Sequence, residues 1–96
     1  MKPSVALEAN QAAIREAGRR FKTQNPRVFG SVLRGDDKDG SDLDLLVDPL
    51  PGVTLFDLGG LQIELEEMFC VPVDLLTPED LPPRYRQNVL LEALPI

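Results

Sequence analysis

The chain has no histidine and a single cysteine, Cys70, among its 96 residues. The lack of histidine excludes Ser-His-Asp and Cys-His catalysis, histidine general bases and histidine-containing zinc sites. One cysteine can form neither a disulfide framework nor a thiolate metal cluster, so a reducing compartment is the natural environment. The longest apolar runs are a handful of residues, and no basic, apolar leader opens the chain. These absences predict a cytoplasmic protein that does not bind membranes.

Positive charge is also scarce. Ten Lys and Arg residues stand against sixteen Asp and Glu residues, which gives a net charge of -6. This balance argues against direct binding of nucleic acid, because such binding depends on neutralising phosphates with basic side chains. Half of the basic residues lie within residues 15–27. We interpret that segment as the solvated face of a surface helix rather than as an anion-binding patch.

Hydrophobic spacing predicts alternating helices and strands. Ser4 can cap a first helix that ends at Asn25-Pro26. Its apolar stripe, at helical spacing, comprises Leu7, Ile14, Ala17 and Phe21. Strands are predicted over residues 27–30, 42–47 and 71–76.

A capping box predicts the next helix. Thr54 with Asp57 precedes a run of apolar residues at helical spacing. Glycine is a poor helix former, so Gly59-Gly60 predicts that the first turn is irregular or that the helix begins later. A second capping pair, Thr77 with Asp80, predicts a short capped turn.

The C-terminal segment predicts a helix with unburied apolar residues. Pro83 suits its first position, and the helix should run towards Ala93. One stripe of a short helix cannot turn all the apolar residues inward; they are Val89, Leu90, Leu91, Leu94 and Ile96. We expect the last three residues in particular to be exposed, and the segment to contact a basic protein partner.

The alternating elements predict one domain over residues 1–96 with an α/β fold. A chain of this length buries only about 60 to 65 % of its unfolded surface, which leaves no room for a separate substrate domain. Helices should flank a small sheet that contains an antiparallel hairpin.

The stretch VFGSVLRGDDKDGSDLDLLVD, residues 28–48, carries the chemistry. A P-loop is excluded because Asp36-Asp37 stand where Lys and Ser or Thr must follow the second glycine. A calcium loop with Gly40 at its sixth position is excluded as well. Its first and twelfth positions would be Gly35 and Leu46, which carry no carboxylate.

Two halves of a site remain in this stretch. Gly30-Ser31 directly follows a strand, so backbone N–H groups and a hydroxyl can approach a phosphate closely. Asp42 and Asp44 alternate along a strand and therefore point to the same face. Such carboxylates are hard oxygen ligands of the kind that hold Mg²⁺ against substrate phosphates. The order predicts phosphate binding followed by metal binding.

The combination of GSVLRG and SDLDLLV resembles the nucleotidyltransferase superfamily related to DNA polymerase β. That pattern joins Gly-Ser, a short turn, Asp-x-Asp and a later third carboxylate. The likeness extends over residues 28–95 and is greatest to the minimal nucleotidyltransferases of prokaryotes. It implies a polymerase β-like fold with a small mixed sheet. It also implies phosphate or nucleotide binding at Gly30, Ser31, Arg34 and Ser41.

Asp74 is the candidate for the third carboxylate. It lies between Val73 and Leu75 in a predicted strand and should face away from the core. An acid inside such an apolar run needs compensation, and a metal site supplies it; the alternative is an acid at a strand edge. The remaining acids of the turns are interpreted as solvating; they are Asp36, Asp37, Asp39 and Asp48. Arg34 has two interpretations, the arginine of the motif or a salt bridge to Asp36 or Asp37.

The resemblance implies Mg²⁺-dependent nucleotidyl transfer. Two Mg²⁺ ions would be held by Asp42, Asp44 and Asp74, and Asp74 would orient or deprotonate the attacking hydroxyl. The donor would be ATP and the group transferred AMP. The acceptor would be a hydroxyl of a HEPN-type ribonuclease toxin. The chain would neutralise this toxin as its antitoxin and could form a hetero-oligomer with it.

Two other classes of function are compatible with the residues. The chain could be a catalytically silent module that neutralises a partner by covering it, although three intact carboxylates count against this. It could also transfer nucleotides to RNA or to a small molecule. Its acidity and the lack of a second domain disfavour that class.

Overall fold

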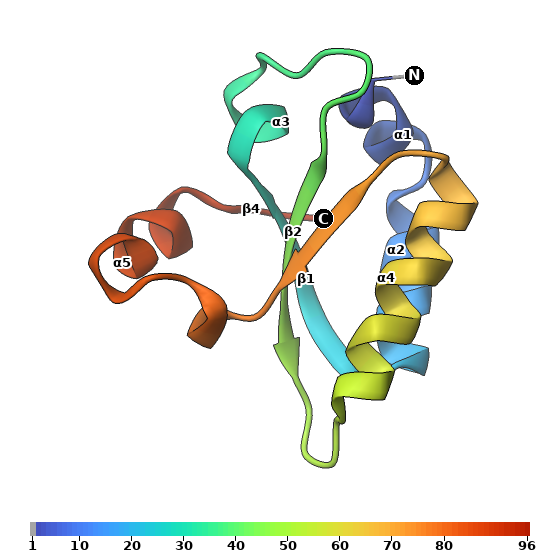
Figure 1. The fold of residues 1–96 in the computed structure, drawn as a ribbon, viewed down its shortest axis with the longest axis vertical. Coiled ribbons are helices and arrows are strands. Elements are labelled where there is room, and N and C mark those ends of the chain that lie inside the picture. The colour runs from blue at the N-terminus through green and yellow to red at the C-terminus, as the bar shows by residue number, and fades with distance from the viewer. Residues whose placement is uncertain (1) are drawn as a thin grey trace.

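The computed structural model describes residues 2–96 and centres on one four-stranded sheet (Figure 1). The strand order is β3-β2-β1-β4. β1 is antiparallel to both β2 and β4, whereas β2 is parallel to β3. The strands are β1 Thr23–Phe29, β2 Leu43–Pro49, β3 Val73–Leu76 and β4 Leu94–Pro95. The prediction of an α/β fold with a mixed sheet and an antiparallel hairpin is confirmed.

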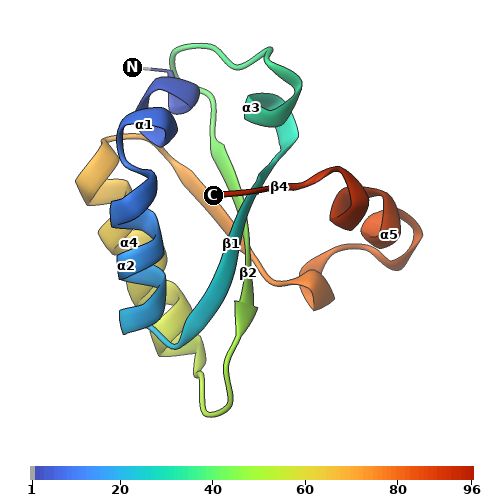
Figure 2. The ribbon, with the colours of Figure 1, turned by 180° about the vertical axis from the view of Figure 1, so that it is seen from behind.

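Helices lie on both sides of the sheet, as the two opposite views show (Figures 1 and 2). One side carries α1 Pro3–Ala9, α2 Gln11–Arg20 and α4 Leu55–Phe69. The other side carries α3 Gly30–Arg34, the 3₁₀ helix η1 Pro78–Asp80 and α5 Pro83–Glu92. None of the helices within residues 2–96 has the length and apolar character needed to span a bilayer.

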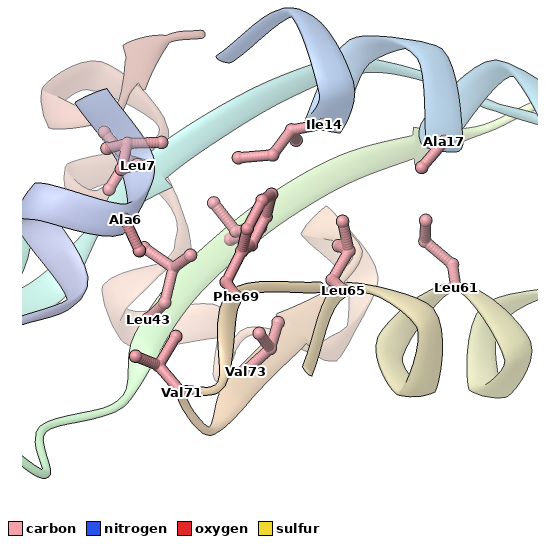
Figure 3. Close-up of a cluster of buried hydrophobic side chains, with 12 residues drawn as sticks. Ala6, Leu7, Ile14, Ala17, Leu43, Leu61, Leu65, Phe69, Val71 and Val73 are labelled. Carbon is pink, nitrogen blue, oxygen red and sulfur yellow. The ribbon is translucent and has the colours of Figure 1, made fainter. Parts of the chain in front are cut away.

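The core lies between the sheet and the pair α2 and α4 (Figure 3). Ile14 and Ala17 of α2 point towards Leu61 and Leu65 of α4, and all four are at most 2 % exposed. Leu43, Leu45 and Val47 of β2 are buried on the same face, as their alternation predicts. Leu46 points the other way and is also fully buried, where β2 contacts η1. The central strand is therefore covered on both faces beyond its first residues.

The first predicted helix is two helices. It is interrupted at Asn10, whose φ of -134° is not helical and whose side-chain amide donates to the Ala6 carbonyl. Ser4 does not cap it; instead the Asp37 carboxylate accepts the Ser4 N–H at 2.9 Å. Asp37 is buried, so its interpretation as a solvated turn residue was wrong. A carboxylate at the first turn satisfies a free amide and the helix dipole.

Asn25-Pro26 does not end a helix but lies inside β1. The pairing register shifts between Gln24 and Arg27, and Asn25 has a φ of +51°. Proline can sit at such a bulge because the bulged residue has no ladder hydrogen bond to donate. The predicted strand at residues 27–30 therefore begins four residues earlier, and Gly30 opens α3 rather than closing the strand.

The helix that follows the Thr54–Asp57 capping box is regular from its first turn. Both hydrogen bonds of the box are present and α4 begins at Leu55, so the prediction of an irregular start at Gly59-Gly60 was wrong. A Cβ on Gly60 would lie 2.8 Å from Cε1 of Phe21, whereas a Cβ on Gly59 would meet nothing within 4 Å. Close packing against Phe21 is thus a physical reason for glycine at position 60 only.

We expect Gly59→Ala to raise the free energy of unfolding by about 0.5 to 1 kcal/mol, because alanine is the better helix former. Gly60→Ala gains the same propensity but must displace the Phe21 ring, so it should be neutral or destabilising. Urea unfolding of both variants checks this, with a shifted midpoint at an unchanged slope. Equal stabilisation by the two substitutions would contradict the packing argument.

The C-terminal segment begins as predicted, with Pro83 at the first position of α5. Its final residues are not a loose chain end, because β4 pairs with β1 and the Ile96 N–H donates to the Pro26 carbonyl at 2.9 Å. Ile96 packs against the core cluster, which corrects the expectation that it is exposed. Leu91 and Leu94 remain 77 % and 55 % exposed, as expected for part of the segment.

Candidate functional site

The strand register brings the two halves of the motif together. Phe29 at the end of β1 is paired with Asp44 of β2, and Asp44 is paired with Asp74 of β3. The residue after Phe29 is Gly30, so the Gly-Ser pair and two of the predicted carboxylates meet at one end of the three strands. Residues separated by up to 44 positions in the sequence thus form one site.

Gly30 is in direct contact with Asp44. Its φ is +73°, and a Cβ built there would lie 2.1 Å from Oδ2 of Asp44. No side chain fits this space unless the carboxylate moves, and the left-handed backbone disfavours other residues independently. The backbone N–H of Ser31 is also close enough to Asp44 to lower the pKa of that carboxyl. The Gly-Ser pair therefore lies directly against Asp44, and its contact with phosphate remains a prediction.

Asp44 is electrostatically strained. Burial, followed by the neighbouring Asp74 and Asp42 carboxylates, raises its pKa to about 6, although Arg34 and the Ser31 N–H act to lower that pKa. Desolvation and like charges both disfavour the ionised carboxylate. A raised pKa beside other acids is typical of sites that bind a cation or transfer a proton.

The three carboxylates differ in exposure. Asp44 is half-buried, whereas Asp42 and Asp74 are exposed. Across residues 2–96, no three His, Cys, Asp or Glu side chains are already gathered closely enough to hold a metal ion. Mutual repulsion is a reason for like charges to stay apart in the absence of a cation. In donor chemistry the trio suits Mg²⁺, which takes carboxylate oxygens and retains waters.

Arg34, at the end of α3, forms the predicted salt bridge to Asp36, and its predicted role in nucleotide binding remains a prediction. Its Nε lies 3.4 Å from Oδ2 of Asp36, a long contact between two exposed side chains. Such a pair contributes little and can be exchanged for another anion. Arg34 is also close enough to Asp44 to lower the pKa of that carboxyl. The side chain can therefore turn to a ligand at the site.

Ser41 lies in the loop that leads into β2. Its hydroxyl oxygen accepts the Lys38 N–H at 2.9 Å, and the Ser41 N–H donates to the Lys38 carbonyl at 3.0 Å. These bonds fix the turn just before Asp42. The hydroxyl is thus engaged within the loop, and its predicted contact with phosphate remains a prediction.

The arginines of residues 15–27 largely pair with the chain's own acids. Arg20 contacts Glu64 and Glu16, and Arg27 lies 2.7 Å from Asp48. Asp48, interpreted from the sequence as solvating, is therefore a structural partner. A groove of about 450 Å³ lies beside this segment, between α2 and β1, away from the acidic site. The pairing favours a structural role for the basic segment.

The sequence did not predict one feature of the site, a pocket beside Gly30. A smaller pocket of about 220 Å³ adjoins Gly30 and is lined by Phe29, Gly30, Leu33, Arg34, Val89 and Glu92. The last two residues belong to α5, which the sequence predicted as a helix but could not place. Only the order of the strands brings α5 beside α3.

The chain is similar to proteins of one family. The family model described as "Nucleotidyltransferase domain" matches residues 12–96. The protein adenylyltransferase MntA of Thermococcus cleftensis is 34 % identical over 88 residues, which cover 92 % of this chain and 86 % of that protein. A relative from Methanocaldococcus jannaschii, provisionally named a protein adenylyltransferase, is 39 % identical over 72 % of this chain and 74 % of its own length.

Solved structures share the fold. One that is described, again provisionally, as a minimal nucleotidyltransferase superposes with a TM-score of 0.87 at 41 % identity, covering 100 % of this chain and 97 % of the other. A second belongs to a toxin–antitoxin with AMP-PNP and superposes with a TM-score of 0.75 at 23 % identity. That match covers 90 % of this chain and 71 % of the other, and it speaks for the fold alone.

Proposed function

Because the chain belongs to the nucleotidyltransferase domain family, we propose that it transfers AMP from ATP to a hydroxyl of a HEPN-type ribonuclease toxin and so neutralises that toxin. The resemblance that Gly-Ser and Asp-x-Asp predicted is confirmed by this membership. The observation that carries the proposal is the contact between Gly30 and Asp44 beside Asp74. It joins a phosphate-binding turn to a strained carboxylate pair.

The choice of AMP and of a protein acceptor is supported by the relatives. The two relatives described above are named protein adenylyltransferases, one of them provisionally. A structural neighbour comes from a toxin–antitoxin and contains AMP-PNP, an analogue of ATP. We extend these properties to this chain because the motif residues are all present in it.

Each residue of the site has a role in this proposal. The N–H groups at Gly30 and Ser31 bind the triphosphate, with Arg34 and Ser41 as further contacts. Asp42, Asp44 and Asp74 would hold Mg²⁺, which neutralises phosphate charge and activates a hydroxyl when bound. Asp74, on the exposed edge strand β3, orients the attacking hydroxyl or takes its proton. Above its pKa of about 6, Asp44 is ionised and ready to bind a cation.

The partner would be a basic protein bound in a hetero-oligomer in the cytoplasm. The net charge of -6 favours encounter with a positively charged ribonuclease and repels RNA. The exposed leucines at the end of α5 and in β4 offer apolar contacts; they are Leu90, Leu91 and Leu94. The single cysteine, Cys70, is a free thiol, which suits a reducing compartment.

ATP labelled at the α-phosphate tests the proposal. Incubated with this chain, Mg²⁺ and a HEPN toxin, it should label the toxin and stop RNA cleavage by that toxin. Chelation of Mg²⁺ should abolish the labelling. Label on RNA or on a small molecule, with none on protein, would overturn the protein acceptor. Inhibition of the toxin without any label would instead indicate neutralisation by binding.

A further inference from the structure

The 220 Å³ pocket beside Gly30 has the chemistry of a site for one aromatic ring. Its walls come from the end of β1, from α3 and from α5, which face each other on one side of the sheet (Figure 1). Phe29, Leu33 and Val89 supply apolar surface. Apolar and aromatic walls stack on the flat face of a nucleobase, whichever base it is.

The pocket shares Gly30 and Arg34 with the phosphate-binding turn. Its volume is below the roughly 300 Å³ at which pockets for whole drug-sized ligands begin. It therefore has room for a ring system but not for a complete nucleotide. If the ring of a ligand fills the pocket, the rest of the ligand would extend past Gly30 towards Ser31 and Asp44. The triphosphate is expected at that position.

Glu92 is the acidic residue of the pocket. A carboxylate only accepts hydrogen bonds, whereas the guanidinium of Arg34 only donates them. The Glu92 side chain is exposed and lines the pocket, so its carboxylate can accept a hydrogen bond from a ligand. Its complement is an amino group on the edge of the ring.

We infer that this pocket takes the adenine ring of ATP and that Glu92 accepts a hydrogen bond from the 6-amino group. Glu92 is then a specificity-determining residue. The inference rests on the proposed function, since it assigns the base of the nucleotide whose triphosphate lies at Gly30 and Ser31. Guanine also presents N–H groups to a carboxylate, so GTP is the competing nucleotide.

The inference is tested by measuring the affinities of the natural chain and of Glu92→Ala for ATP and for purine riboside triphosphate. Purine riboside triphosphate differs from ATP only in lacking the 6-amino group. In the presence of Mg²⁺, the full chain should bind it about tenfold more weakly than ATP, as expected for a lost hydrogen bond to a charged group. Glu92→Ala should bind the two nucleotides equally. The ratio of the two affinities within each protein is the informative quantity. Loss of the Glu92 charge changes the affinity for both triphosphates by the same factor and so cancels in this ratio.

Two controls separate the base from the rest of the ligand. Glu67→Ala removes an exposed carboxylate from α4 and should keep the tenfold preference for ATP. Val89→Phe fills the pocket and should weaken ATP binding about tenfold while leaving the affinity for inorganic tripolyphosphate unchanged. Equal binding of both nucleotides by the natural chain would overturn the inference, and so would a preference in Glu92→Ala that is undiminished.

Three further outcomes of these binding measurements would contradict the inference. Tighter binding of GTP than of ATP, lost in Glu92→Ala, would overturn the assignment to adenine. Absence of any binding of ATP and of tripolyphosphate would overturn the proposed function as well. Tripolyphosphate binding that depends on Asp44, with no contribution from the base, would overturn only this inference.

Discussion

Asp44→Asn is expected to abolish nucleotidyl transfer and at the same time to stabilise the protein at neutral pH. The transfer rate should fall about 100-fold or more, because one charge is lost from the ligands proposed for Mg²⁺. Stability should rise because Asp44 is held half-buried beside Asp42 and Asp74, which raises its pKa to about 6. Removing that charge relieves the desolvation and the repulsion.

The gain in stability should depend on pH. The pKa of Asp44 is about 6 in the folded chain, against an ordinary value of 3.8. Between these values the folded chain binds the proton more tightly than the unfolded chain, so stability falls as the pH rises through about 6. In metal-free buffer, Asp44→Asn should therefore exceed the natural chain in unfolding free energy by about 1 to 2 kcal/mol above pH 7. The difference should vanish below about pH 4.

Asp48→Asn is the matched control, four residues along the same strand. Asp48 accepts hydrogen bonds from Asn25 and Arg27, which lower its pKa although burial opposes them. Its substitution should destabilise the chain at neutral pH and leave transfer unchanged. Thermal melts at pH 4 and 7.5, combined with transfer assays, read both effects. A less stable Asp44→Asn at pH 7.5, or one that retains full activity, would contradict the assigned role of Asp44.

Asp44→Asn and Asp48→Asn should change the free energy of unfolding in opposite directions, although both residues lie on β2. This difference is expected if Asp44 belongs to a functional site and Asp48 does not. A structural acid such as Asp48 is retained with its cationic partner, whereas Asp44 is retained among other acids. An active site commonly keeps groups that lower the stability of the fold. Mg²⁺ should offset the destabilising effect of the Asp44 carboxylate. A ligand that binds only the folded state of a chain raises its melting temperature. That rise should be absent in Asp44→Asn.

Local sequence signals predicted much of the fold. Three of these signals depend only on neighbours in the chain, and each agrees with the structure. They are the Thr54–Asp57 capping box, Pro83 at the first position of α5, and the alternation of Leu43, Asp44 and Leu45. The same alternation predicted Asp42 and Asp44 on one face of a strand, but Asp42 lies just before the first residue of β2. Capping and side-chain alternation act over a few residues, so one sequence suffices to find them.

The errors of prediction arose where distant contacts decide. Asp37 reads as a turn residue, yet it caps α1 from 33 positions away. Gly60 reads as a weak point of α4 until Phe21 is placed against it. Glu92 carries no signal in the sequence, because its place beside Gly30 follows from the sheet order. Tertiary contacts override local propensity at such positions.

Gly30→Ala is expected to cause the largest loss of activity among substitutions that add a single methyl group. The added Cβ would lie 2.1 Å from Oδ2 of Asp44, a distance at which the carboxylate must move. A displacement of about 1 Å at a reacting centre can cost about 100-fold in rate. The displaced Asp44 carboxylate should also move away from the Ser31 N–H, which lowers its pKa.

Gly35→Ala isolates this contact from backbone strain. Gly35 ends the same short helix with a φ of +78°, close to the +73° of Gly30, but a Cβ there would meet nothing within 4 Å. Both substitutions impose a left-handed backbone on alanine, at a cost of about 1 kcal/mol. Only Gly30→Ala pushes on Asp44. Gly35→Ala should therefore lose stability but retain transfer, and Ser31→Ala should fall between the two because its backbone amide remains.

Transfer of AMP from labelled ATP, measured beside the unfolding midpoint of each variant, resolves the comparison. The expected result is an activity ratio of about 100 between Gly35→Ala and Gly30→Ala at similar stability. If the two alanine variants were equally active, Gly30 would matter only through its backbone conformation. Gly30→Val should be at least as impaired as Gly30→Ala, since the larger side chain adds volume in the same direction. The physical requirement at position 30 is then the absence of any atom between the turn and the Asp44 carboxylate.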